Sequence, residues 1–173
     1  KQYANYLKKY SKVILNENKK DLKIAKKIKN NLIERLKLDN NKINQIIKSI
    51  KKIIEFKDPL NKNLLNWKRP NGLKIKKISI PIGVIGVIYE SRPNVTSDVS
   101  SLCFKSGNAV ILRGGSNAFY SNKILANLFR KALRKNNCNE DSIQLIENRD
   151  RKNVDYLLSK MEKYIDIIIP RGG

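Results

Sequence analysis

The chain has 173 residues, of which 40% are hydrophobic and 30% charged, and it carries a formal net charge of +22 without any histidine. This length suffices for one domain with a buried core. Cys103 and Cys138 form no metal-binding spacing, which together with the lack of histidine argues against a zinc site, so we expect no metal. The longest apolar run, residues 78–89, is too short and too interrupted to span a bilayer.

The positive charge taken alone suggests a nucleic acid or an anionic membrane as partner. The basic residues are mostly lysines, however, spread among Asn and Ile through the first eighty positions, and no array of aromatic side chains accompanies them to stack on bases. We interpret this charge as compositional drift of AT-rich coding DNA and expect neither partner. A basic α/β module that binds nucleic acid remains the alternative, and its binding would weaken steeply with salt.

Residues 1–58 show helical periodicity. The clearest helix follows Asp39, a residue suited to cap a helix, and ends at the Asp58-Pro59 step. A polar connector then leads to Asn71-Gly72, a strong signal for a tight turn, and to an exposed or edge strand over residues 73–80. One continuous apolar stripe marks the helix after Asp39, formed by Ile43, Ile46, Ile47, Ile50, Ile53 and Ile54.

From Val84 onward the pattern alternates between short apolar strands and amphipathic helices. This alternation predicts a parallel sheet with right-handed crossovers, that is, a doubly wound, Rossmann-like α/β fold. We expect a helical segment over residues 1–66 and a nucleotide-binding α/β domain over 67–173, incomplete because the chain ends on glycines directly after a strand. The expected strands are 84–89, 109–112, 142–146 and 165–169, and the helices run from a cap at Thr96 to Lys105, over 121–134, and from a cap at Asp150 to Lys160.

Loops at the carboxyl ends of three of these strands each contain an arginine. They cover residues 90–94 with Arg92, 113–116 with Arg113 and 170–173 with Arg171. Parallel strands place such loops on one edge, so we predict a cationic pocket for phosphate groups, aided by helix N-termini. The alternative is that the glycines only permit tight turns and the arginines lie in solvent. Neither a dinucleotide fingerprint nor a P-loop is present, so the residues alone lead no further.

Three segments resemble the signature of the γ-glutamyl phosphate reductases, a family within the aldehyde dehydrogenase superfamily. They are residues 81–96, residues 105–115, and residues 164–166 with 169–173, and weaker similarity covers 32–39 and 70–73. The resemblance implies an aldehyde-dehydrogenase-like fold and NADP(H)-dependent reduction of L-glutamate 5-phosphate to the semialdehyde with release of phosphate, the second step of proline synthesis. It also implies a homo-oligomer at full length. The cytoplasmic location that we expect rests on the cysteines instead, because a structural disulfide between Cys103 and Cys138 is improbable and a reducing cytosol fits better.

The resemblance assigns roles to individual residues. Asn94 matches the superfamily asparagine whose amide stabilises the oxyanion, although it could instead form an Asx-turn before a helix at Thr96. Arg113 matches a basic residue that contacts the cofactor ribose. Arg92 is a candidate for the substrate carboxylate or phosphate. Gly114, Gly115 and Ser116 share the Arg113 loop, and the neutral Asn117, where many relatives are acidic, favours NADP over NAD.

The family nucleophile, a cysteine, lies downstream of the segment that matches residues 164–173. Neither Cys103, which is expected inside a helix facing the core, nor Cys138 takes its place. We therefore expect this chain to be an amino-terminal fragment that reduces nothing by itself. Two alternatives remain, namely another acyl-phosphate or aldehyde dehydrogenase of the superfamily, and a degenerate, non-catalytic remnant.

Overall fold

The computed structural model describes residues 1–25 and 30–172, so positions 26–29 of the expected helical stretch and Gly173 of the last loop lie outside the described residues. Within that part of the chain, no helix is both long and apolar enough to cross a membrane. In chain order the elements, with η for a short 3₁₀ helix, are α1 (Gln2–Lys9), α2 (Ser11–Ile24), α3 (Asn30–Leu36), α4 (Asn40–Glu55), β1 (Asn63–Lys68), β2 (Lys74–Ile78), β3 (Val84–Tyr89), α5 (Pro93–Lys105), β4 (Ala109–Gly114), η2 (Ser116–Ala118), α6 (Phe119–Lys135), η3 (Glu140–Ser142), β5 (Ile143–Leu145), α7 (Lys152–Lys160) and β6 (Ile167–Arg171).

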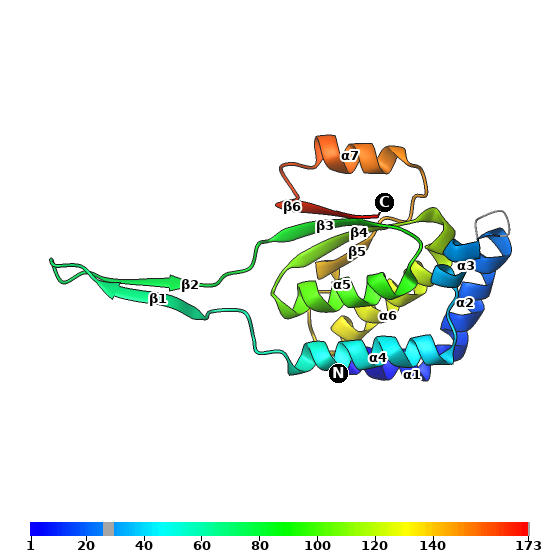
Figure 1. Cartoon of the computed structure of the whole chain (residues 1–173), viewed down its shortest axis with the longest axis horizontal. Coiled ribbons are helices and arrows are strands. Elements are labelled where there is room, and N and C mark those ends of the chain that lie inside the picture. Colours follow the sequence, from blue (N-terminus) through cyan, green and yellow to red (C-terminus); the bar gives the residue numbers. More distant parts are fainter. Residues whose placement is uncertain (26–29, 173) are drawn as a thin grey trace.

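Four strands form the parallel sheet, in the order β5-β4-β3-β6. Helices α5 and α6 lie on one side of the sheet, and α7 lies on the other (Figure 1). The predicted Rossmann-like α/β architecture is therefore confirmed. Successive strands add on one side of β3 until β5, and the chain then crosses to the other side to form β6, so the topological switch point lies between β3 and β6.

Strands β4 and β6 extend further than the sequence pattern predicts. Gly114 and Arg171 both pair with Tyr89, the last residue of β3. Arg113 and Arg171 are thus strand residues rather than loop residues, because the central strand offers backbone partners out to that point. The turns that follow these strands each begin two residues later than expected.

The amino-terminal helices share one hydrophobic core with the sheet. Leu7 and Ile14, which are completely buried, belong to the same cluster as Leu112 of β4 and Leu125 of α6. The expected division at 66/67 falls within β1, and the assignment of two functional parts stays a prediction. The predicted cap on α4 is confirmed, since the Asp39 carboxylate accepts from the Lys42 amide at 2.7 Å. Its isoleucine stripe faces the core, with Ile43, Ile46, Ile50 and Ile53 buried.

Strands β1 and β2 form a separate antiparallel hairpin that extends away from the body of the molecule (Figure 1). Gly72 has φ +91°, a conformation that glycine adopts without strain, so the predicted Asn-Gly turn is confirmed. The side chains of β1 are all exposed, among them Leu64, Leu65 and Trp67.

The prediction that Thr96 caps α5 is wrong. The helix begins three residues earlier at Pro93, because proline suits the first helical turn, where its missing N–H costs nothing. Thr96 is instead completely buried. Its hydroxyl bonds to the Tyr89 hydroxyl at 2.7 Å and donates to Asn122 Oδ1 at 2.9 Å, and so links β3, α5 and α6.

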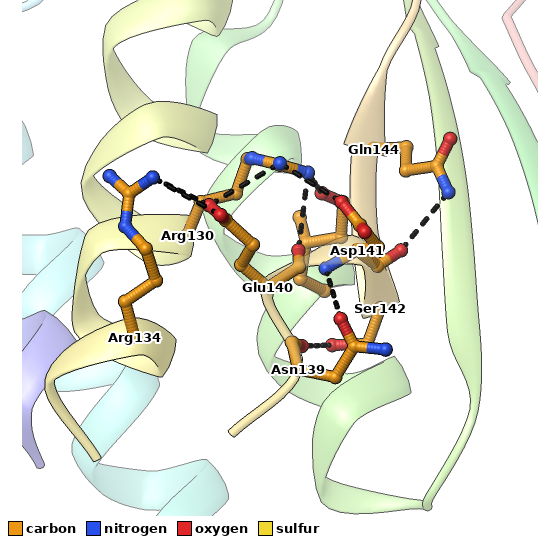
Figure 2. A network of polar contacts seen from close by, with 8 residues as sticks. Arg130, Arg134, Asn139, Glu140, Asp141, Ser142 and Gln144 are labelled. Carbon is orange, nitrogen blue, oxygen red and sulfur yellow. Dashed lines mark hydrogen bonds and ion pairs between the residues drawn. The ribbon is translucent and has the colours of Figure 1, made fainter. Parts of the chain in front are cut away.

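A network of arginines and carboxylates fixes the connection from α6 to β5 (Figure 2). Arg130 donates to the Ile143 carbonyl at 2.9 Å and pairs with Asp141 at 3.0 Å. Arg134 pairs with Glu140 at 2.9 Å. A guanidinium suits this task because its planar array of donors reaches a carbonyl and a carboxylate together. The short edge strand β5 is thereby tied to α6.

Replacing Leu112 by Ala should destabilise the protein by about 2–5 kcal/mol, because this side chain is completely buried in a central strand and its removal leaves a cavity. Equilibrium urea unfolding measures the difference. The matched control is Leu158→Ala, whose leucine is 60% exposed and should change the unfolding free energy by less than about 0.5 kcal/mol. Equal losses in the two variants would contradict the described core.

Replacing Asn18 by Ala should cost about 3 kcal/mol of unfolding free energy. The buried Asn18 amide donates to the Leu36 carbonyl and to Ser121 Oγ, each at 2.9 Å, and accepts from the Leu38 amide at 2.8 Å. The substitution removes the Asn18 partner of the Leu36 carbonyl and of the Leu38 amide, at about 1–3 kcal/mol each before relaxation, whereas Ser121 Oγ keeps its bond to Asp21. Asn44→Ala, on the exposed side of α4, is the control that should leave the unfolding midpoint unchanged.

Candidate functional site

Three loops meet at the carboxyl edge of the sheet, as predicted. A Cβ atom on Gly115, after β4, would lie 3.1 Å from the Ser91 amide nitrogen, and one on Gly172, after β6, would lie 2.9 Å from Glu90 Cγ. The loop after β3 therefore touches both neighbouring loops. This close contact explains why glycine occupies these two positions, because larger residues would push the loops apart.

A cavity of about 230 Å³ lies at this edge, at the switch point between β3 and β6. Its lining includes Arg92 and Arg171, from two of the three predicted loops. The third arginine of the lining is Arg35 of α3, whose guanidinium lies 3.9 Å from the Glu90 carboxylate. Sequence reasoning missed Arg35, because nothing in the pattern of residues 30–36 shows that this short helix lies beside the sheet edge (Figure 1).

Arg113 is not part of this lining. Its side chain is 7% exposed and donates to the carbonyls of Gly114 and Arg149, the latter at 3.2 Å. Burial lowers the pKa of this guanidinium, and its Nε has no hydrogen-bond partner among the described residues. Arg113 thus ties the segment before α7 to the end of β4, and its contact with a cofactor stays a prediction.

The remaining residues of the predicted cofactor loop lie at the start of the α6 crossover. Gly114 packs against Asn122 and the Tyr89 ring so closely that a Cβ atom would collide with both. Gly115 is partly exposed and Ser116 is exposed. Their contact with a cofactor stays a prediction.

The N-terminus of α6 is already occupied by a carboxylate. Buried Asp21 accepts from the amides of Tyr120 at 3.0 Å and Ser121 at 2.8 Å, and from Ser121 Oγ at 2.6 Å. Burial raises the pKa of Asp21, and these hydrogen bonds oppose the shift. The expected help of this helix N-terminus in binding a phosphate is therefore limited, since two of its donors are taken.

Asn94 is the second residue of α5 and is exposed beside a second hollow of about 250 Å³, which Arg35 also lines. Its Nδ2 donates to Asp98 Oδ2 at 3.2 Å, one helical turn away. Because the helix starts before Asn94, the alternative of an Asx-turn leading into a helix at Thr96 no longer applies. Burial raises the pKa of Asp98, against the opposing effect of the Asn94 hydrogen bond.

Cys103 does not have the surroundings of a nucleophile. Cys103 is buried in α5 as expected, and burial raises its thiol pKa to about 11, so it stays protonated at neutral pH. Cys138 lies partly exposed after α6. Within residues 1–25 and 30–172, no three His, Cys, Asp or Glu side chains are grouped so that they could hold a metal ion.

No family model matches the chain. Curated relatives do match it, and all those named here are γ-glutamyl phosphate reductases. The protein from Nautilia profundicola is 48% identical over 100% of this chain and 42% of its own length, and the one from Thermoanaerobacter sp. is 52% identical over 92% of this chain and 39% of its own. The chain thus spans about two fifths of the length of these relatives.

Solved structures agree with the sequence comparison. The crystal structure of γ-glutamyl phosphate reductase from Thermotoga maritima superposes with a TM-score of 0.95 at 41% identity, over 99% of this chain and 42% of that one. The enzyme from Saccharomyces cerevisiae gives 0.90 at 32% identity, over 99% and 44%. A propionaldehyde dehydrogenase from Rhodopseudomonas palustris shares the fold, with a TM-score of 0.64 at 16% identity. This match covers 99% of this chain and 37% of that one. Over the two fifths of their length that it spans, this chain belongs to the family of the γ-glutamyl phosphate reductases.

Proposed function

We propose that the protein carrying this chain reduces L-glutamate 5-phosphate to L-glutamate 5-semialdehyde with NADPH and releases phosphate, the second step of proline synthesis. The observation that carries the proposal is the 43–52% identity to γ-glutamyl phosphate reductases over 92–100% of the chain. The reaction consumes one acyl phosphate, one NADPH and one proton. It yields one aldehyde, one NADP⁺ and one inorganic phosphate.

The proposed chemistry is covalent catalysis. A cysteine thiolate attacks the acyl carbon and phosphate leaves with the electron pair of the broken C–O bond. The bound nicotinamide cofactor supplies the hydride that reduces the acyl group. Since the relatives are more than twice as long as this chain, we place the nucleophile outside these 173 residues and expect the chain alone to be inactive.

Asn94 is our candidate for the oxyanion donor. A side-chain amide carries two N–H donors on one nitrogen, so the bond to Asp98 leaves the second N–H for a ligand. The Asp98 contact also fixes the amide orientation, since a carboxylate accepts only from the nitrogen end. An amide placed in this way stabilises negative charge on the acyl oxygen as it develops in the transition state.

The loop after β4 is our candidate for the cofactor site. Gly115 is partly exposed and Ser116 is exposed, and Gly114 lets the turn stay close to β3. Arg113 would contribute by holding the Arg149 segment in place, and by its charge if its side chain turns toward a 2′-phosphate. The neutral Asn117 next to them favours NADP. We also propose that the full-length protein is cytoplasmic and forms a homo-oligomer.

Replacing Asn94 by Ala in the full-length protein should lower kcat for NADPH oxidation by about 10²–10³-fold with little change in KM, because an oxyanion donor acts mainly in the transition state. The assay follows NADPH consumption with glutamyl phosphate. Asn41→Ala, an exposed asparagine of α4, is the control that should retain full activity. A normal kcat for the Asn94 variant would remove this residue from the catalytic machinery.

Replacing Cys103 and Cys138 together by Ala should leave kcat within about a factor of two of the parent protein. A thiol with a pKa of about 11 has almost no thiolate at neutral pH, and the nucleophile is proposed to lie elsewhere. Steady-state rates and incorporation of iodoacetamide, compared with and without substrate protection, measure the outcome. Complete loss of activity in a variant that remains folded would place the nucleophile within this chain.

A further inference from the structure

The cavity at the switch point is positively charged and small. Three arginines and one glutamate contribute the charged groups of its lining, namely Arg35, Arg92, Arg171 and Glu90. Its volume of about 230 Å³ is below the roughly 300–1,000 Å³ of pockets that enclose whole small molecules. A site of this size and charge suits one anionic group of a larger ligand rather than the entire ligand.

Arg35 reaches this cavity because the backbone around it is held on both sides. The next residue, Leu36, is completely buried, and its carbonyl accepts from the Asn18 side chain at 2.9 Å. The Leu38 amide donates to the same side chain at 2.8 Å. The Lys42 ammonium group donates a hydrogen bond to the Glu34 carbonyl at 2.6 Å. The base of the Arg35 side chain is thus preorganised, while its guanidinium end stays about half exposed.

Glu90 gives this arginine a resting partner. The Arg35–Glu90 distance of 3.9 Å, with both side chains about 40% exposed, makes a weak ion pair. A phosphate dianion presents more acceptor oxygens and more charge than a carboxylate, and it binds a guanidinium in a bidentate manner. An incoming phosphate therefore competes well for Arg35, and Arg92 and Arg171 offset the charge of Glu90.

We propose that Arg35, together with Arg92 and Arg171, binds the phosphoryl group of the acyl phosphate, and that Arg35 is a specificity residue contributed by the helical segment. The inference rests on the proposed function, since it names which end of that substrate enters this cavity. It requires no change in bonding. The same arginines hold the inorganic phosphate that leaves after the acyl group is transferred.

The test measures binding of inorganic phosphate to the full-length protein by calorimetry. Charge-assisted hydrogen bonds to phosphate are stronger than neutral ones, and the half-exposed position of Arg35 weakens its contribution through solvent screening. Arg35→Gln should therefore weaken phosphate binding about tenfold, whereas Arg35→Lys should retain part of the affinity. The matched control is Arg69→Gln, which removes the same charge at the exposed hairpin turn and should bind phosphate like the parent.

A second arm separates the two phosphates that the reaction brings to this edge. The KM for NADP⁺ should stay within about twofold in Arg35→Gln, while the KM for inorganic phosphate in the reverse reaction rises about tenfold. A raised KM for NADP⁺ with unchanged phosphate binding would overturn the inference in favour of a cofactor site. Equal phosphate affinity in Arg35→Gln and the parent, or no binding to the parent, would also overturn it. Phosphate binding without any NADPH oxidation would instead refute the proposed function and leave the anion site standing.

Discussion

The parallel pairing of β3 with β4 on one side and β6 on the other is the constraint on which the site depends. Because Tyr89 pairs with Gly114 and with Arg171, three chain segments end at the same level of the sheet. The turns that follow these strands therefore lie side by side at that edge of the sheet. Arg92 and Arg171 therefore line one cavity although they lie far apart in the sequence. Backbone hydrogen bonding, rather than any attraction between like-charged arginines, gathers the positive charge.

A buried chain of hydroxyl and amide groups supports this edge from below. The hydroxyls of Tyr89 and Thr96 and the amide of Asn122 bond in sequence at 2.7 and 2.9 Å. Burial raises the pKa of Tyr89, so its hydroxyl remains a neutral hydrogen-bonding group. Groups of this kind are costly to bury unless every partner is present. The requirement explains why glycine stands at 114, where any side chain would displace the Asn122 amide.

Features that depend on local interactions could be predicted from the sequence, whereas features that depend on contacts between distant residues could not. The α4 cap at Asp39, the turn at Gly72 and the parallel strands all depend on neighbours within a few residues or on apolar periodicity, and they are confirmed. Threonine is a residue type that often caps helices, but the Thr96 hydroxyl bonds to Asn122, which lies 26 positions away. For the predicted site, the position of the three loops followed from strand order. The side-chain directions did not, because Arg113 turns toward backbone carbonyls and Arg35 enters from a helix whose packing no local pattern reveals.

The helical segment is consequently part of the site and not only its support. Asn18 and Asp21 of α2 both bond to Ser121 at the start of α6, so the segment that carries Arg35 is locked to the helix that leaves the sheet edge. Any displacement of α2 would move Arg35 relative to Arg92. Lysines account for most of the positive charge, but the described lysines are mostly exposed and none of them lines this cavity. The proposed phosphate binding depends on where a few guanidinium groups are held, and the placement of Arg35 comes from buried neutral and acidic side chains.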